Sequence, residues 1–162
     1  MSKFRIGSAY DVHRLIAGEG IVLGGIKVPC NFQTVAHSDG DVVFHALGEA
    51  IMGSLALGDL GTYFPPDDDK YSNMDSILII DFCRNKLKES NFEICNLDIS
   101  IIAEKPKLKS LIFSIRNSVA NALGIDLNQV SVKAGTNEGL DAIGREQAIG
   151  CFATVLIEKR QN

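Results

Sequence analysis

The sequence lacks any apolar run that approaches the roughly 20 residues a membrane-spanning helix needs. Its first residues, MSKFRIGSAYD, contain neither an apolar signal-peptide core nor a small-residue cleavage site. A surplus of positive charge is also missing, because the formal net charge is −4 at pH 7. We therefore predict a cytoplasmic protein with no membrane partner and no nucleic-acid partner that depends on a basic surface. A small phosphate-bearing ligand remains compatible with this charge.

Cysteine is scarce and poorly placed for cross-linking or metal binding. The four cysteines stand at positions 30, 83, 95 and 151, and none forms a C-x-x-C pair. We expect reduced thiols without a metal. The sequence also lacks a Walker-type loop, a G-x-G-x-x-G loop and a serine or cysteine nucleophile with a base at motif spacing. A reaction on this protein would therefore take its nucleophile from water or from the substrate itself.

The chain is long enough for one domain with a substantial core, and we interpret residues 1–162 as a single domain. A period of two predicts strands and a period near 3.6 predicts helices. In chain order we expect a strand at 4–13 and a hairpin at 21–29 around Gly24-Gly25. A helix follows, with an S-x-x-D cap formed by Ser38 and Asp41 and a stop near Gly58, and a second helix is expected at about 73–89. The rest of the chain is expected to form a strand at 96–103, a helix from after 107 to Leu123 with Gly124 as its stop, and strands at 129–135 and 148–159. This order indicates an α+β fold, a mixed sheet with helices on one face.

The last predicted strand is apolar on both faces. One face carries Ile149, Cys151, Ala153, Val155 and Ile157, and the other carries Ala148, Phe152 and Leu156. The protein's own helices are expected to cover only one face of the sheet. A strand buried on both sides in so small a chain therefore predicts a homo-oligomer, in which partner subunits cover the second face.

The stretch AYDVH at residues 9–13 places Asp11 and His13 on the same face of the first strand. His45, on the helix that follows, would complete a set of three nitrogen and oxygen ligands. Three such ligands with a fourth position left open are typical of a catalytic zinc site. The alternative is a surface Asp–His pair, with His45 engaged one helical turn away by Asp41 or Glu49.

Further segments carry groups suited to phosphate or to a hard cation. His37 precedes a helix N-terminus, where free backbone N–H groups attract anions. Thr136 and Glu138 lie between glycines, and Glu138 would hold Mg²⁺ against phosphate oxygens. The compact basic cluster of the chain consists of Lys105, Lys107 and Lys109. Each segment also has a plain structural interpretation, as a loop histidine, a turn or a solvated helix start, but their combination with a zinc site suggests a diphosphate substrate.

Five segments carry a resemblance to a known family. AYDVH, AHSDGDVVFHAL, GDLGTYFPPDD, AEKPKL and KAGTNEGLDAIGRE, in this order and with this spacing, resemble the 2-C-methyl-D-erythritol 2,4-cyclodiphosphate synthases over nearly the whole chain. The resemblance implies a step of the non-mevalonate isoprenoid pathway. In it, 4-diphosphocytidyl-2-C-methyl-D-erythritol 2-phosphate is cyclised to the 2,4-cyclodiphosphate and CMP is released. It also implies a homotrimer, with the sheets of three subunits packing about the trimer axis and active sites between neighbours.

The resemblance assigns roles to particular residues. Asp11, His13 and His45 would hold Zn²⁺, and Glu138 would hold Mg²⁺ or Mn²⁺. His37 and Thr136 would position the reacting phosphates and stabilise the transition state. The further substrate contacts that it implies, besides these residues, are Val12, Ser38, Asp59, Leu60, Gly61, Phe64, Pro65, Pro66, Asp67, Asp68, Ala103, Glu104, Lys105, Pro106, Lys107, Leu108, Lys109, Ala134, Gly135, Asn137 and Arg145. Residues 59–61 and 64–68 would line the erythritol side, whereas 103–109, Ala134 and Thr136 would receive the cytidine part from the adjacent subunit.

The implied chemistry agrees with the missing protein nucleophile. The 2-phosphate of the substrate attacks the β-phosphorus and CMP leaves in line, so the protein supplies positioning and charge neutralisation. A zinc phosphohydrolase that uses metal-bound water is the alternative in another enzyme class. The chain departs from the commoner family pattern at Ser8, Gly135 and Ala142, while Arg145 matches a family arginine near the trimer axis. Ala142 bears on the shape of the central cavity that binds isoprenoid phosphates in some members.

Overall fold

A computed structural model describes residues 3–65, 67–71 and 73–160 of the chain. The elements are β1 (Phe4–Ala17), β2 (Gly20–Leu23), β3 (Ile26–Pro29), β4 (Phe32–Val35), α1 (Val42–Ser54), α2 (Ile77–Glu89), β5 (Phe92–Ile102), α3 (Ile112–Leu123), β6 (Val130–Gly135), α4 (Asp141–Gly144) and β7 (Ala148–Lys159), with short 3-10 turns at Leu60–Thr62, Asp69–Tyr71 and Leu127–Gln129. Among these helices, none has the length and apolar character that crossing a membrane requires.

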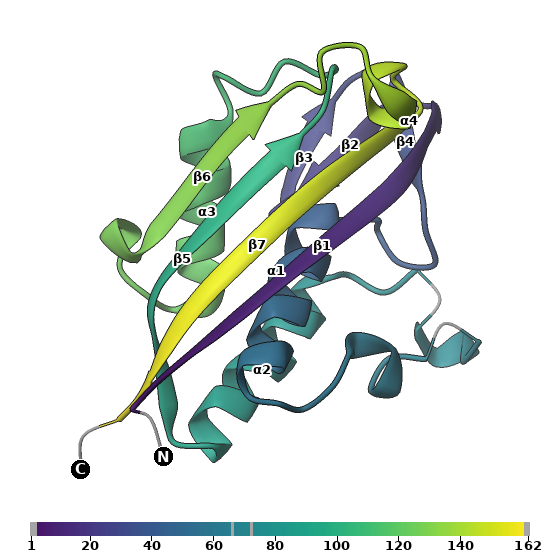
Figure 1. Cartoon of the computed structure of the whole chain (residues 1–162). Helices are drawn as coiled ribbons and strands as arrows, with labels where there is room; N and C mark the ends of the chain where they lie inside the picture. Colours follow the sequence, from purple (N-terminus) through teal and green to yellow (C-terminus); the bar gives the residue numbers. More distant parts are fainter. Residues whose placement is uncertain (1–2, 66, 72, 161–162) are drawn as a thin grey trace.

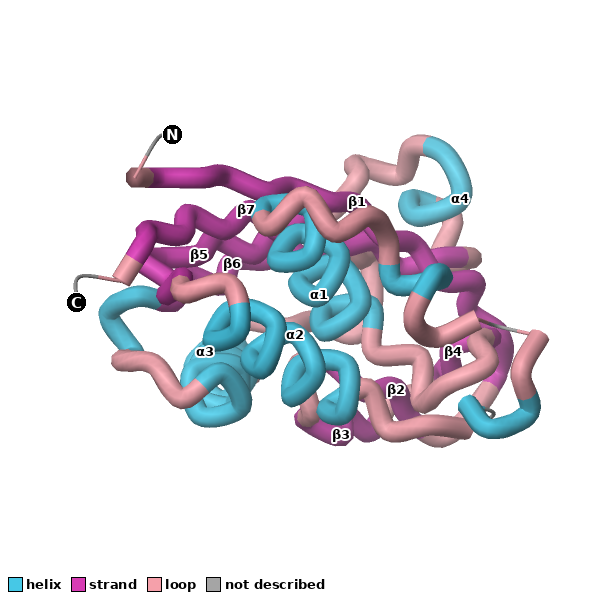
Figure 2. Tube along the Cα trace, turned by 90° about the horizontal axis from the view of Figure 1, so that it is seen from below, coloured by secondary structure: helices cyan, strands magenta, loops and turns pink. Residues whose placement is uncertain are grey.

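The main sheet has five strands in the order β4-β1-β7-β5-β6, and β2 and β3 form a separate hairpin (Figure 1). β5 and β6 run parallel, whereas the other neighbouring strands are antiparallel. Helices α1, α2 and α3 form a layer on one face of this sheet (Figure 2). The predicted α+β fold with a mixed sheet and helices on one face is therefore confirmed.

The first strand separates its side chains between the two faces of the sheet. Gly7, Asp11 and His13 point toward the helix layer, as the alternation predicts, and are buried or half-buried. The other face carries exposed apolar side chains, which we call the open face: Phe4 (48% exposed), Ile6 (69%), Tyr10 (47%) and Val12 (47%) on β1, and Phe152 (51%) on β7. Phe152 is exposed on the second face of β7, so the helices of the single chain cover only one face, as expected, and cover of the second face by partner subunits stays a prediction.

The close approach of α1 to β1 depends on a residue without a side chain. A Cβ atom on Gly7 would lie 1.9 Å from the carbonyl oxygen of Ala50 and 2.9 Å from the Cβ of Ser54. Any larger residue would force the helix away from the sheet. Glycine here lets α1 lie directly over the strand that carries Asp11 and His13, and Phe44, Leu47 and Ile51 of α1 are fully buried.

The start of α1 differs from the predicted cap. Asp41 is the N-cap residue, and its carboxylate accepts the N–H groups of Val43 and Phe44 at 3.0 and 3.1 Å. The same carboxylate accepts the N–H groups of Gly24 and Gly25 at 2.9 and 2.6 Å, so it also fixes the predicted hairpin turn between β2 and β3. Ser38 is not the cap, because its hydroxyl faces His45 instead.

Several boundaries also differ from prediction. Helix α1 ends at Ser54, before the predicted stop at Gly58, and α3 begins only at Ile112. The left-handed Gly124 ends α3 as predicted. β4 was not predicted, and the segment 136–146 between the last two predicted strands contains the single turn of α4. All four cysteines are free thiols, and burial raises the pKa of Cys83 to about 12.

Candidate metal centre

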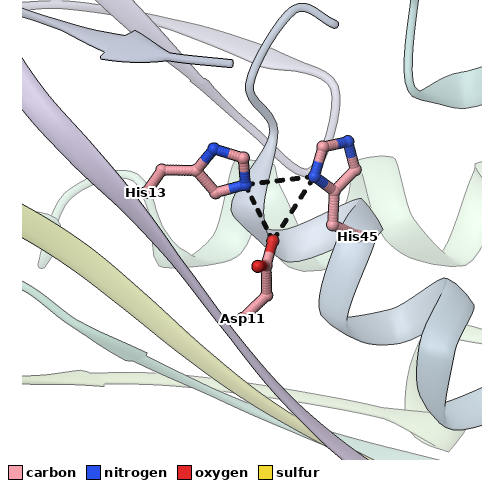
Figure 3. Close-up of side chains that lie close together, drawn as sticks. All are labelled: Asp11, His13 and His45. Carbon is pink, nitrogen blue, oxygen red and sulfur yellow. Dashed lines mark hydrogen bonds and ion pairs between the residues drawn. The ribbon is translucent and has the colours of Figure 1, made fainter. Parts of the chain in front are cut away.

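Three side chains from two elements converge beneath the sheet. Asp11 and His13 project from β1 and His45 from the first turn of α1, and all three point toward one another (Figure 3). Asp11 Oδ2 lies 2.8 Å from His13 Nε2 and 3.3 Å from His45 Nδ1. His13 Nε2 lies 3.1 Å from His45 Nδ1. Residues 32 positions apart in the chain thus meet as the sequence predicts.

The geometry of these three atoms fits a transition-metal ion. Zinc bonds to nitrogen and oxygen ligands are about 2.0–2.1 Å long, so the edges of a tetrahedral site are roughly 3.3 Å. The three separations of 2.8, 3.1 and 3.3 Å are close to such edges. Within the described residues, Asp11, His13 and His45 form the one group of three that could hold a metal. The structure therefore provides a candidate site for a divalent cation.

The electrostatics of Asp11 favour its charged form. Burial by itself would raise the pKa of this carboxyl, but the neighbouring imidazoles of His13 and His45 outweigh that effect and hold its pKa well below the usual range. A metal binds the deprotonated carboxylate, so a low pKa keeps the ligand ready.

The structural alternative for His45 is wrong. Asp41 has its carboxylate committed to four backbone N–H groups and is fully buried. Glu49 Oε1 accepts the Leu60 N–H at 3.1 Å. The second ring nitrogen of His45, Nε2, which does not face Asp11, lies 3.1 Å from Ser38 Oγ and 3.0 Å from Ser76 Oγ.

A pocket of about 660 Å³ opens over these three side chains. Of the other predicted site residues, it is lined by Val12, His37, Ser38, Leu60 and Phe64. Its walls also include residues that the sequence analysis did not assign to the site, namely Glu49, Tyr71, Met74 and Ile79. Met74 and Ile79 follow a loop without regular hydrophobic periodicity, and no sequence pattern predicts that they lie near His45. Glu49 was considered only as a structural partner of His45.

Glu49 is the one titratable carboxyl group among these four residues that the sequence analysis did not assign to the site. Burial raises the pKa of its carboxyl, and the hydrogen bond from Leu60 N–H opposes that shift. The i, i+4 spacing from His45 places it on the same helix face, which was the signal available from the sequence. It ties α1 to the turn that contains Leu60, one of the residues expected on the erythritol side.

The remaining predicted residues form a second cluster at the ends of β5 and β6. The carboxylate of Glu104 accepts the N–H groups of Asn137 and Gly139 at 2.9 and 3.3 Å, which joins the segment 103–109 to the loop after β6. Thr136 Oγ1 lies 3.3 Å from Glu138 Oε1 in that loop. These residues do not line the pocket of Asp11, so the predicted site residues fall into two separate clusters within the chain.

Other predicted contacts lie between or beside these clusters. Asp59 is exposed and caps the turn at Leu60–Thr62 through the Thr62 N–H at 2.9 Å. Leu108 is 5% exposed and belongs to the core, whereas Lys107 and Lys109 are exposed. Pro66 lies outside the described residues. The other predicted contacts, found in the described part of the chain, are Gly61, Pro65, Asp67, Asp68, Ala103, Lys105, Pro106, Ala134, Gly135 and Arg145.

Comparison with known proteins agrees with this arrangement. The model of the YgbB family matches residues 4–158. A 2-C-methyl-D-erythritol 2,4-cyclodiphosphate synthase of Prochlorococcus marinus (strain MIT 9312) is 41% identical over 161 residues, which cover 98% of this chain and 96% of the relative. The synthase of Fusobacterium nucleatum is 43% identical over 157 residues, covering 97% and 98%.

Solved structures give the same result. The structure described as "IspF (Plasmodium falciparum) CDP complex" superposes with a TM-score of 0.88 at 34% identity, covering 99% of both chains. The bifunctional IspDF of Campylobacter jejuni superposes with a TM-score of 0.92 at 33% identity, covering 98% of this chain and 43% of that one. The matched family model and these near-full-length relatives place the chain in the YgbB family, the family of the 2-C-methyl-D-erythritol 2,4-cyclodiphosphate synthases.

Proposed function

We propose that this protein cyclises 4-diphosphocytidyl-2-C-methyl-D-erythritol 2-phosphate to 2-C-methyl-D-erythritol 2,4-cyclodiphosphate and releases CMP. The observation that carries the proposal is the convergence of Asp11, His13 and His45 at 2.8–3.3 Å, in a chain that belongs to this family of synthases. The relatives named above are synthases, so the phosphohydrolase alternative has no support from them.

Zinc is the ion that we propose for the site. A carboxylate oxygen and two imidazole nitrogens suit zinc, and three protein ligands leave one position for a ligand. When bound, the ion acts as a Lewis acid on a phosphate oxygen. His37, exposed at the rim of the pocket, is placed to contact a phosphate that enters it. Substrate binding at this rim aligns the 2-phosphate with the β-phosphorus, so that no protein nucleophile is needed.

We further propose that the complete active site lies between subunits of a homotrimer. The two half-sites of one chain, around Asp11 and around Thr136, do not share a pocket. A neighbour that supplies residues 103–109, Ala134 and Thr136 would bring the cytidine part next to the metal of the first subunit. Glu138 would then hold Mg²⁺ or Mn²⁺ on the diphosphate. The CDP complex of the Plasmodium falciparum protein supports a cytidine diphosphate ligand. The cytoplasmic location stays a prediction.

The experiment that tests the function follows both products. The purified protein is incubated with zinc, magnesium and the diphosphocytidyl substrate. CMP is measured by chromatography and the phosphorus product by ³¹P NMR. Two coupled phosphorus signals of a cyclic diphosphate are expected together with CMP. Two uncoupled phosphate-monoester signals of an open-chain 2,4-bisphosphate would instead indicate the hydrolase, and the absence of CMP release with both metals present would contradict the proposal.

A further inference from the structure

Ser76 has the position of a helix cap but not its interactions. It is the N-cap residue of α2 and is fully buried, yet its side chain makes no capping hydrogen bond. A serine at this position normally accepts a hydrogen bond from the first turn of its helix. Here its hydroxyl points away from α2, toward Asp39 on one side and His45 on the other. The lost cap suggests that this hydroxyl serves another purpose.

The direction of the hydrogen bonds that connect Asp39, Ser76 and His45 follows from the fact that the Asp39 carboxylate acts as an acceptor. The Asp39 carboxylate receives the Ser76 hydroxyl, the Ser76 N–H at 3.1 Å and the Asp41 N–H at 3.2 Å. An ionised carboxylate only accepts hydrogen bonds, and a serine hydroxyl has one proton to donate. Because that proton goes to Asp39, Ser76 Oγ is left to accept from His45 Nε2, which lies 3.0 Å away.

This direction determines the tautomer of His45. A neutral imidazole that carries its proton on Nε2 has its lone pair on Nδ1. Nδ1 is the atom that faces His13 Nε2 at 3.1 Å and Asp11 Oδ2 at 3.3 Å. The lone pair of His45 is therefore presented to the point at which the other two ligands converge.

The backbone holds Asp39 and Ser76 in place independently of His45. The segments 37–41 and 73–76 pair through the Asn73 N–H on the His37 carbonyl at 2.6 Å and the Asp39 N–H on the Met74 carbonyl at 3.0 Å. A parallel bridge joins Ser38 to Met74. The acceptor for His45 is thus part of a preformed backbone arrangement.

We propose that Asp39 and Ser76 are positioning residues of the metal site, with Ser76 fixing His45 in the Nε2–H tautomer and Asp39 fixing the hydroxyl of Ser76. The inference rests on the proposed metal role of Asp11, His13 and His45. Hydrogen-bonded partners of metal-binding histidines commonly contribute about 10–100-fold to metal affinity. Ser38 Oγ, 3.1 Å from the same nitrogen, is the competing partner and belongs to the pocket wall.

The test measures zinc affinity by competition with a fluorescent chelator at pH 8. Ser76→Ala is expected to lower the affinity about 10–100-fold, and Asp39→Asn is expected to lower it less. Ser54→Ala is the matched control, because Ser54 is also a buried serine (4% exposed) but donates to the Ile51 carbonyl within α1. It should keep wild-type affinity, whatever it does to thermal stability. Ser38→Ala is expected to change the affinity by less than Ser76→Ala does.

A second readout needs neither a variant nor a metal. Long-range ¹H–¹⁵N NMR of the metal-free wild type at pH 8, above the ordinary histidine pKa of about 6.5, distinguishes the two imidazole tautomers. His45 is expected as the Nε2–H form. An Nδ1–H form, a Ser76→Ala affinity within twofold of wild type, or an equal loss in Ser38→Ala would each overturn the proposal. Failure of the wild type to bind zinc would instead contradict the proposed metal role, and the tautomer measurement would still test Ser76.

Discussion

At the residue scale, the charge of Asp11 is the feature that the candidate metal site depends on most. Its two histidine partners are neutral as ligands, so the carboxylate alone offsets the charge of a divalent ion. Its depressed pKa shows that the folded chain already stabilises this charge through His13 and His45. A change that removes the charge but keeps the shape isolates this contribution.

We therefore expect Asp11→Asn to lose most of its zinc and at least about 100-fold of its CMP release, because an amide is a poor zinc ligand. Metal content by mass spectrometry and the CMP assay measure the two effects. The matched control is Asp81→Asn, which removes an exposed carboxylate paired with Arg84 at 3.3 Å on α2. Wild-type zinc content in Asp11→Asn would contradict its role as a ligand.

Glu49 gives a pH-dependent prediction. Burial raises its pKa in the folded protein above the unfolded value, so the folded state binds more protons between the two values. Its contribution to the free energy of unfolding is therefore full at acid pH and declines as the pH rises through the folded pKa. Glu49→Gln removes this decline while keeping an oxygen acceptor for Leu60 N–H.

The measurement is urea unfolding of the metal-free wild type and of Glu49→Gln between pH 4 and pH 7. The variant is expected to gain stability relative to the wild type as the pH rises. Parallel stability curves for the two proteins would show that the Glu49 carboxyl is not perturbed in this way.

At the element scale, the contact between α1 and β1 decides whether the three ligands meet. Asp11 and His13 are fixed by the strand, and His45 is fixed by the helix that crosses it. Gly7 sets the separation of the two elements, because a Cβ at this position would overlap the backbone of α1 at Ala50. The packing at Gly7 therefore affects the position of His45 relative to Asp11 and His13, which lie further along the same strand.

Gly7→Ala is expected to lower the free energy of unfolding by about 1–3 kcal/mol, as overpacking does, and to weaken zinc binding by displacing His45. Gly53→Ala is the matched control within α1, because a Cβ there meets no described atom within 4 Å. It should be neutral or stabilising by up to about 1 kcal/mol, since alanine favours the helix. Chemical denaturation and zinc titration of both variants test the prediction; equal effects would contradict it.

At the scale of the whole molecule, the open face of the sheet is the largest departure from an ordinary surface. Tyr10 and Phe152 stack on it with ring centroids 4.5 Å apart, and Ile6 is 69% exposed. Exposed apolar groups of this kind commonly mark interaction sites. Together with the separation of the two clusters of predicted site residues, this face supports the proposed trimer.

Phe152→Glu is therefore expected to dissociate the proposed trimer and to abolish CMP release in the dissociated protein, because a charge would be buried at the interface. Leu78→Glu is the control, since Leu78 is 51% exposed on α2, in the helix layer away from the open face. Analytical ultracentrifugation measures the assembly. A wild type that sediments as a monomer, or full activity in a monomeric Phe152→Glu, would contradict the interface proposal.

Local sequence determined much of the protein. The alternation at 4–13 placed Asp11 and His13 on the covered face of one strand, because side chains of a strand alternate by geometry alone. Gly24-Gly25 and Gly124 marked a turn and a helix end, since both require backbone that glycine adopts easily. The motifs around His13, His45 and Glu138 indicated the family and its chemistry.

Only the tertiary structure decided how these pieces combine. Asp41 rather than Ser38 caps α1, because the hairpin turn at Gly24-Gly25 comes close enough to share its carboxylate. Ser76 reaches His45 across 31 positions, a distance that no local pattern encodes. Contacts between segments remote in sequence depend on packing, which the order of residues does not reveal locally.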